Sequence, residues 1–196
     1  MESFYLDRPL NFAHQGACHE APANTLAAFL LAVELGADGI EFDVHLCADG
    51  EVVVIHDFTV DATTDGQGPV RDKTLSELKR LDAGSWFDPA FSSERIPTLG
   101  EVIDVVGQRL LLNIELKTVG LRGEGLAKDV VQIVEESRLL ERVVSSSFNP
   151  LSRWQVRRGN PSITIGLLYA PDQPLLLLRA WIRYLFRPEA LHPYNT

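Results

Sequence analysis

Residues 39–57 read GIEFDVHLCADGEVVVIHD, two apolar, β-branched runs separated by an Asp-Gly turn. The runs 39–46 and 51–57 are predicted to be strands joined through Asp49-Gly50. This link leaves no room for a crossover helix, which usually takes roughly a dozen residues or more between parallel strands. The first strand is unusual because it carries two acidic residues inside an otherwise apolar run.

Short apolar runs and helical patterns alternate along the rest of the chain, which predicts an α/β protein with a parallel sheet. Polar residues gather where the strands end, as they do in (β/α)8 barrels and in doubly wound sheets. Further strands are expected at 10–14, 110–117, 143–148, 164–169 and from 190 onward. Helices are expected from an Asn24 cap to about Leu35, near 75–81, from a Thr98 cap to about Val106, and at 124–138, 150–158 and 175–187.

Length and charge narrow the class of protein. The 196 residues suit one domain, and the formal net charge of −9 argues against a nucleic-acid partner. No apolar run is long enough to span a membrane, and the first residues do not resemble a secretory signal, so a cytoplasmic protein is expected. Two cysteines, Cys18 and Cys47, are too few for a disulfide scaffold.

Acidic residues inside the strands suggest a metal site. Glu41 and Asp43 are two residues apart, so their side chains share one face of a strand, and Glu115 and Lys117 repeat this spacing. Buried ion pairing of Lys117 with Glu115 or Glu41 is the simpler interpretation. One lysine cannot neutralise three buried acids, so we predict a divalent cation held by Glu41, Asp43 and Glu115, with Mg²⁺ or Ca²⁺ favoured by the all-oxygen ligands.

Two histidines stand at strand ends near these acids. His14 and His56 suit general acid and base catalysis near neutral pH. His45 is expected to face outward or to line the loop. His19 lies in a loop and His192 near the end of the sequence, and structural or surface roles are expected for both.

Several motifs, in matching order, resemble the glycerophosphodiester phosphodiesterase family. They are HQGA (14–17), PANT (22–25), GADGIEFDVHL (36–46), DGEVVVIHD (49–57), TTDGQGPV (63–70), LDAGSWFDPAF (81–91), RIPTLGEV (95–102) and LNIELK (112–117), with looser matches at SSFNP (146–150) and ALHPYNT (190–196).

The resemblance implies a TIM (β/α)8-type barrel of the phospholipase C-like phosphodiesterase kind, forming one domain over residues 1–196. The family has a short link at 47–50 and a small insertion after the third strand, here 58–95. Family barrels continue roughly fifty residues further, so the last barrel strands are expected to be missing.

The implied reaction is the metal-dependent hydrolysis of small glycerophosphodiesters to sn-glycerol 3-phosphate and an alcohol. Carried over by position, Glu41, Asp43 and Glu115 are similar to the family's metal ligands and His14 and His56 to its acid–base pair. Lys117 matches its phosphate-binding lysine, and Gln15 occupies a further substrate-binding position.

Two departures from the family pattern leave other functions open. Gln15 stands where arginine is usual, which removes a charged phosphate contact, and Ala23 replaces a glutamate. A catalytically impaired phosphodiester-binding protein is therefore one alternative. A lysophospholipase D-type enzyme is another, prompted by the arginines at 179, 183 and 187, although membrane association is not expected. An aldolase using Lys117 is disfavoured because neighbouring acids keep a lysine protonated. The sequence is also compatible with a homo-oligomer.

Overall fold

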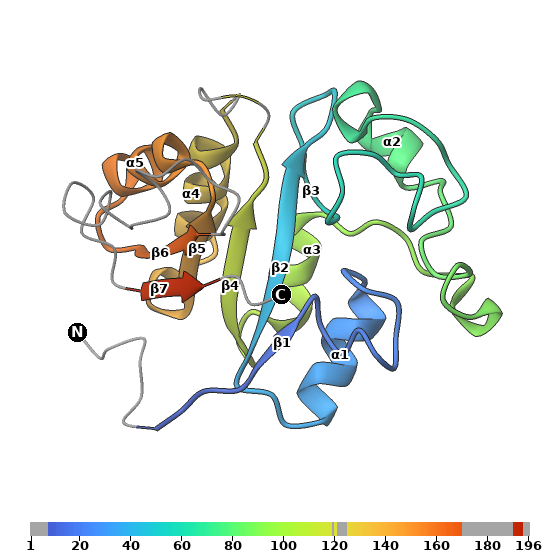
Figure 1. Ribbon diagram of the computed structural model, residues 1–196, viewed down its shortest axis with the longest axis horizontal. Helices are drawn as coiled ribbons and strands as arrows, with labels where there is room; N and C mark the ends of the chain where they lie inside the picture. Colours follow the sequence, from blue (N-terminus) through green and yellow to red (C-terminus); the bar gives the residue numbers. More distant parts are fainter. Residues whose placement is uncertain (1–7, 119, 121–124, 170–189, 194–196) are drawn as a thin grey trace.

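The fold is a twisted, mainly parallel sheet with helices packed against it, seen in a computed structural model that describes residues 8–118, 120, 125–169 and 190–193 (Figure 1). The strands of this seven-stranded sheet follow the order β1-β2-β4-β5-β6-β7, all parallel, with β3 attached to β2. They are β1 (Phe12–His14), β2 (Gly39–Leu46), β3 (Val52–Val54), β4 (Leu111–Leu116), β5 (Val143–Ser147), β6 (Thr164–Tyr169) and β7 (Ala190–Pro193).

The strand β3 is antiparallel to β2, with Val44 opposite Val54. Gly50, in the connecting turn, has a φ of +85°, a conformation that glycine adopts at little cost. An antiparallel hairpin needs no crossover helix, which explains the short link. The prediction of a strand over 51–57 was too long, because β3 ends at Val54 and His56 lies beyond it.

Four of the five described α-helices begin at a residue whose side chain caps the helix, and the helix that follows Gly125 does not. Thr98 caps α3 (Leu99–Val106) as predicted, in a capping box with Glu101. The prediction that Asn24 caps the first helix was wrong, because the Thr25 side chain accepts the hydrogen bond from the Ala28 amide. The α-helices are α1 (Leu26–Glu34), α2 (Leu75–Leu78), α3 (Leu99–Val106), α4 (Leu126–Glu136) and α5 (Pro150–Gly159).

Apolar and acidic residues alternate along β2, so they lie on opposite faces of the sheet. Ile40, Phe42 and Val44 are fully buried in the main core, together with apolar residues of the surrounding helices. The acidic residues between them therefore project to the other face of the sheet. A second core, with Val53 and Leu78 at its centre, lies under the loop-rich segment between β3 and α3.

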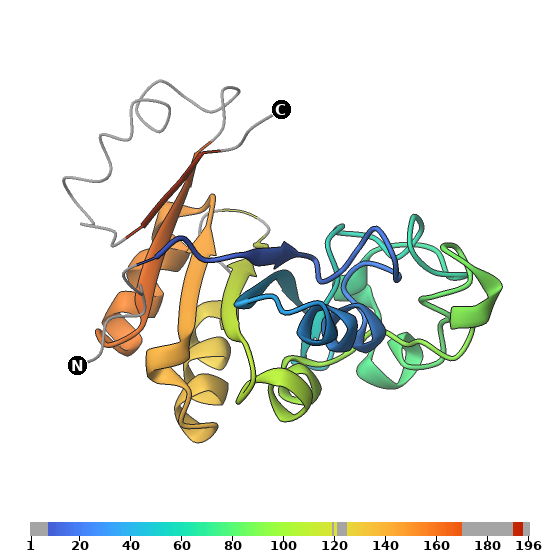
Figure 2. The same cartoon turned by 90° about the horizontal axis from the view of Figure 1, so that it is seen from below.

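Viewed from below, that loop-rich segment and β7 lie at opposite ends of the molecule (Figure 2). Among the described strands, β1 and β3 each pair with β2 alone and β7 pairs with β6 alone, so these three strands lie at the edges of the sheet. The helix expected at 175–187 lies outside the described residues, whereas β7 confirms a strand beginning at 190. Within the described chain, no helix has the length and apolar character needed to cross a membrane. Cys18 and Cys47 are free thiols.

Candidate active site

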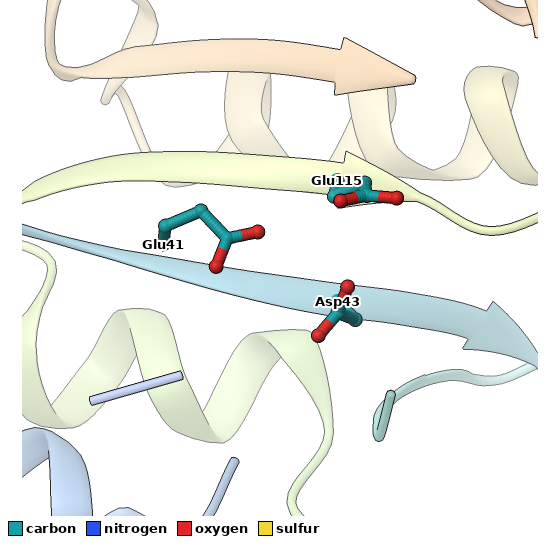
Figure 3. A group of neighbouring side chains, drawn as sticks. All are labelled: Glu41, Asp43 and Glu115. Carbon is teal, nitrogen blue, oxygen red and sulfur yellow. The ribbon is translucent and has the colours of Figure 1, made fainter. Parts of the chain in front are cut away.

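Three carboxylates from two neighbouring strands meet on one face of the sheet (Figure 3). Glu41 and Asp43 come from β2 and Glu115 from β4, and Asp43 lies directly opposite Glu115 in the strand register. One oxygen of each carboxylate lies within 4.8 Å of one oxygen of each of the others. The sheet therefore brings together the three acids that the sequence analysis had grouped.

Lys117 follows β4 and reaches back into this cluster. Its Nζ lies 3.1 Å from Oδ1 of Asp43 and 2.9 Å from Oε1 of Glu115. Its second partner is thus Asp43, not Glu41, within the part of the chain that the structure describes. Burial alone would lower the pKa of Lys117, but the charges of Asp43 and Glu115 outweigh that effect and raise it. The lysine is therefore a fixed positive charge at neutral pH.

One lysine leaves the cluster with an excess of negative charge. Burial, followed by the charges of Asp43 and Glu115, raises the pKa of Glu41 well above its ordinary value. Burial likewise raises the pKa of Glu115. The Oε2 atom of Glu41 is buried without a hydrogen-bond donor. Crowded carboxylate oxygens and an unpartnered buried oxygen fit a hard divalent cation, which prefers oxygen ligands.

Two amide side chains hold the remaining oxygen of Asp43. The Nδ2 of Asn24 lies 3.1 Å, and the Nε2 of Gln15 3.3 Å, from Oδ2 of Asp43. Both residues have a positive φ, of 59° and 56° respectively, which turns the loop after β1 toward the cluster. This role of Asn24 was not predicted, because asparagine also suits the cap of the helix that follows. The signal was available, since Thr25 beside it is an equally suitable N-cap residue.

The histidines at the strand ends are accessible to solvent. Nε2 of His14 lies 3.6 Å from Oε2 of Glu41, and its side chain is 72% exposed. Nδ1 of His56 lies 2.7 Å from Oδ1 of Asp57, and its side chain is 49% exposed. An imidazole oriented by a carboxylate and open to a ligand can accept or donate a proton near neutral pH.

The expectation that His45 faces outward was wrong. Residues 41, 43 and 45 have the same parity along β2, so His45 shares the face of the acids. It is buried, and burial lowers the pKa of its imidazole to about 4. Its Nε2 lies 3.1 Å from the backbone oxygen of His56. His19 is exposed, as expected, and the side chain of His192 lies outside the described residues.

Two cavities adjoin the cluster. A cavity of about 470 Å³ has Lys117 and His45 in its lining. A much smaller one, of about 30 Å³, is lined in part by Gln15, Asn24 and His56. With a divalent cation held by the acids, the lysine and the two exposed histidines could bind an anionic group and transfer protons at it. These are the requirements for cleaving a phosphate ester.

Comparisons with known proteins identify one family of phosphodiesterases. Residues 14–188 match the glycerophosphoryl diester phosphodiesterase family. A glycerophosphodiester phosphodiesterase from Caldanaerobacter subterraneus is 46% identical over 190 residues, covering 95% of this chain and 76% of that protein. One from Bacillus altitudinis is 39% identical over 176 residues, covering 86% of this chain and 72% of the relative.

Solved structures show the same fold. An Oleispira antarctica phosphodiesterase, in complex with its product sn-glycerol-3-phosphate, aligns with a TM-score of 0.83 at 34% identity and covers 98% of this chain and 77% of its own. A glycerophosphodiester phosphodiesterase from Agrobacterium tumefaciens aligns with a TM-score of 0.71 at 26% identity, covering 93% and 94% of the two chains. These alignments confirm the expected barrel-type α/β fold.

Proposed function

Because this chain belongs to the glycerophosphoryl diester phosphodiesterase family, we propose that it hydrolyses glycerophosphodiesters to sn-glycerol 3-phosphate and an alcohol. The observation that carries the proposal is the cluster of Glu41, Asp43 and Glu115, paired with Lys117 and placed beside an exposed His14. Buried acids in such excess over their counter-charge are costly to a fold unless they bind a cation.

The three carboxylates would hold a divalent cation, Mg²⁺ or Ca²⁺. When bound, such a cation supplies positive charge to a phosphoryl oxygen as negative charge develops there. Lys117 places a second positive charge beside the same group, because its Nζ is already anchored between Asp43 and Glu115. Gln15 contributes an uncharged hydrogen-bond donor from the loop after β1, where its amide already points at Asp43.

His14 and His56 would carry the proton transfers. One imidazole takes the proton from the nucleophile, either water or the glycerol 2-hydroxyl, as its oxygen bonds to phosphorus. If the 2-hydroxyl attacks, the product is a cyclic phosphate, and water must then open the ring at the bond from phosphorus to that oxygen to give glycerol 3-phosphate. The other imidazole gives a proton to the oxygen of the departing alcohol as the bond from phosphorus to that oxygen breaks. Asp57 orients the His56 ring through Nδ1 and leaves Nε2 available to the substrate.

The test is release of glycerol 3-phosphate from glycerophosphocholine after treatment with EDTA, with Mg²⁺ or Ca²⁺ then returned. Release that stops with EDTA and resumes with metal supports the reaction and its metal dependence. No release from a sample shown to be folded by circular dichroism would overturn the proposed hydrolysis. Glycerol 3-phosphate binding without turnover would instead favour an impaired phosphodiester-binding protein.

The His56→Ala variant separates a role of His56 in catalysis from a role in ligand binding and structure. We expect it to lose glycerol 3-phosphate release while it still binds glycerol 3-phosphate, measured by calorimetry in the presence of metal. Loss of both would assign His56 a structural role and contradict the proton-transfer scheme.

A further inference from the structure

The larger cavity lies between Lys117, which contacts the carboxylate cluster, and the loop-rich segment that follows β3. Its volume is about 470 Å³, within the usual range for a small-molecule pocket. Lys117 and His45 form its inner side, and Phe58, Pro69 and Arg71 form the side contributed by the loop segment.

We propose that this cavity binds the alcohol head group of the diester, and that Arg71 makes it favour head groups with negative charge over quaternary ammonium head groups. This inference rests on the proposed function, because it assumes that the phosphate lies at the carboxylate cluster beside Lys117.

The position of the cavity fits a group attached to that phosphate. Lys117 belongs to both the carboxylate cluster and the cavity lining, since its Nζ contacts Asp43 and Glu115 while the residue also lines the cavity. His45 lies two residues beyond Asp43 on the same face of β2, so the cavity extends from Lys117 toward the carboxyl end of that strand.

The size and lining of the cavity favour the head group over the glycerol half. A glycerol unit would fill only a small part of about 470 Å³. Leu46, Phe58 and Pro69 give the cavity apolar walls, which offer little to a polyol. The second cavity, at about 30 Å³, has room for roughly one water molecule and cannot hold either half of the substrate.

The charge of the cavity lining favours a negatively charged head group. The cationic residues of the lining are Lys117 and Arg71, and no acidic residue is among the described residues that form it. Lys117 is already paired with Asp43 and Glu115, so Arg71 is the charge left for a head group. Nε of Arg71 lies 3.7 Å from Oδ1 of Asp72, but both side chains are more than half exposed, so water weakens this pair.

The experiment compares three diesters of glycerol 3-phosphate whose alcohols are close in size: choline, its uncharged analogue 3,3-dimethylbutanol, and 3-hydroxypropionate. With Mg²⁺ present, we expect kcat/KM to rise from choline to 3,3-dimethylbutanol to 3-hydroxypropionate. Each step should be about two- to fivefold, the range that one partly exposed ion pair provides. Arg71→Gln should remove the difference, and Arg71→Lys should keep most of it.

Arg80→Gln is the matched control, because Arg80 is also exposed but binds the backbone oxygen of Ser76, outside the cavity. This variant should keep the wild-type order of substrates. Phe58→Ala should raise KM for 3,3-dimethylbutyl esters if the ring forms the apolar wall.

The outcomes separate this inference from the proposed function. If none of the three diesters releases glycerol 3-phosphate, the proposed function fails. If all three are cleaved but Arg71→Gln leaves their order unchanged, the assignment of Arg71 is wrong. If choline is the preferred head group, the exposed Phe58 ring governs the cavity through cation–π attraction, which overturns the anionic preference.

Discussion

The imidazole of His45 lies 3.1 Å from the backbone oxygen of His56, so a buried side chain of β2 fixes the segment that follows β3. The rings of His45 and Phe58 also meet edge to face, with centroids 5.0 Å apart. Both contacts hold the chain on either side of Asp57, whose carboxylate orients the His56 ring. We therefore expect His45 to act as a positioning residue for His56, which we propose takes part in proton transfer.

Removing this contact should slow the reaction more than it weakens substrate binding. In His45→Leu the donor to the His56 carbonyl is lost, and we expect kcat to fall about tenfold or more, with KM changed much less. His45→Gln keeps an amide donor and should recover part of the loss. Steady-state kinetics and thermal melting of both variants check this. Equal kcat for the two variants would mean that the hydrogen bond does not position His56.

Replacing Glu41 by glutamine should abolish metal-dependent release of glycerol 3-phosphate, because one of three ligands loses its charge. The metal-free variant should melt at the same temperature as the metal-free wild type or higher, since the buried Oε2 of Glu41 has no hydrogen-bond donor. Calorimetric Mg²⁺ binding and melting curves in EDTA measure both effects. Wild-type turnover by Glu41→Gln would remove Glu41 from the ligand set.

The Gln15→Arg variant should raise kcat/KM by about tenfold, the lower end of what a charged hydrogen bond provides. The backbone at this position already has a φ of 56°, and the side chain already points at Asp43, so arginine meets no new backbone strain. Gln15→Met, similar in length but uncharged and without a donor, is the control and should lower kcat/KM. No gain from arginine would mean that the pocket has adapted around glutamine.

A pH dependence of stability is expected from Asp38, which lies just before β2. The guanidinium of Arg8, followed by the Asn11 amide, lowers the pKa of Asp38 to about 2 from an ordinary value of 3.8. A lowered carboxyl pKa stabilises the fold above the unfolded value and loses that effect as the pH falls toward the folded value.

Asp38→Asn should therefore be less stable than wild type in urea at pH 7, with a difference that shrinks between pH 4 and about pH 2. In Arg8→Gln, an NMR titration should show the pKa of Asp38 moving up toward 3.8. A pKa that stays near 2 in this variant would show that the Asn11 amide, not Arg8, lowers it.

Local patterns were enough for most of the elements. Thr98 caps α3 where its sequence predicts, and β2 and β6 span the predicted residues, because capping and strand alternation depend on near neighbours. The error at Asn24 arose between two adjacent residues that can both cap a helix. The buried carboxylate of Asp43, distant in sequence, is bound by the Asn24 side chain, and Thr25 is the cap.

The grouping of Glu41, Asp43, Glu115 and Lys117 followed from the sequence, because charged residues inside apolar strands have few ways to be accommodated. Strand alternation alone predicts that His45 lies on the same face of the sheet as Glu41 and Asp43. The short link between β2 and β3 already favours an antiparallel β3. The pairing of Lys117 with Asp43 and the cavity at Arg71 depend instead on which strands and loops become neighbours. Those contacts join segments far apart in the chain, so only packing in three dimensions specifies them.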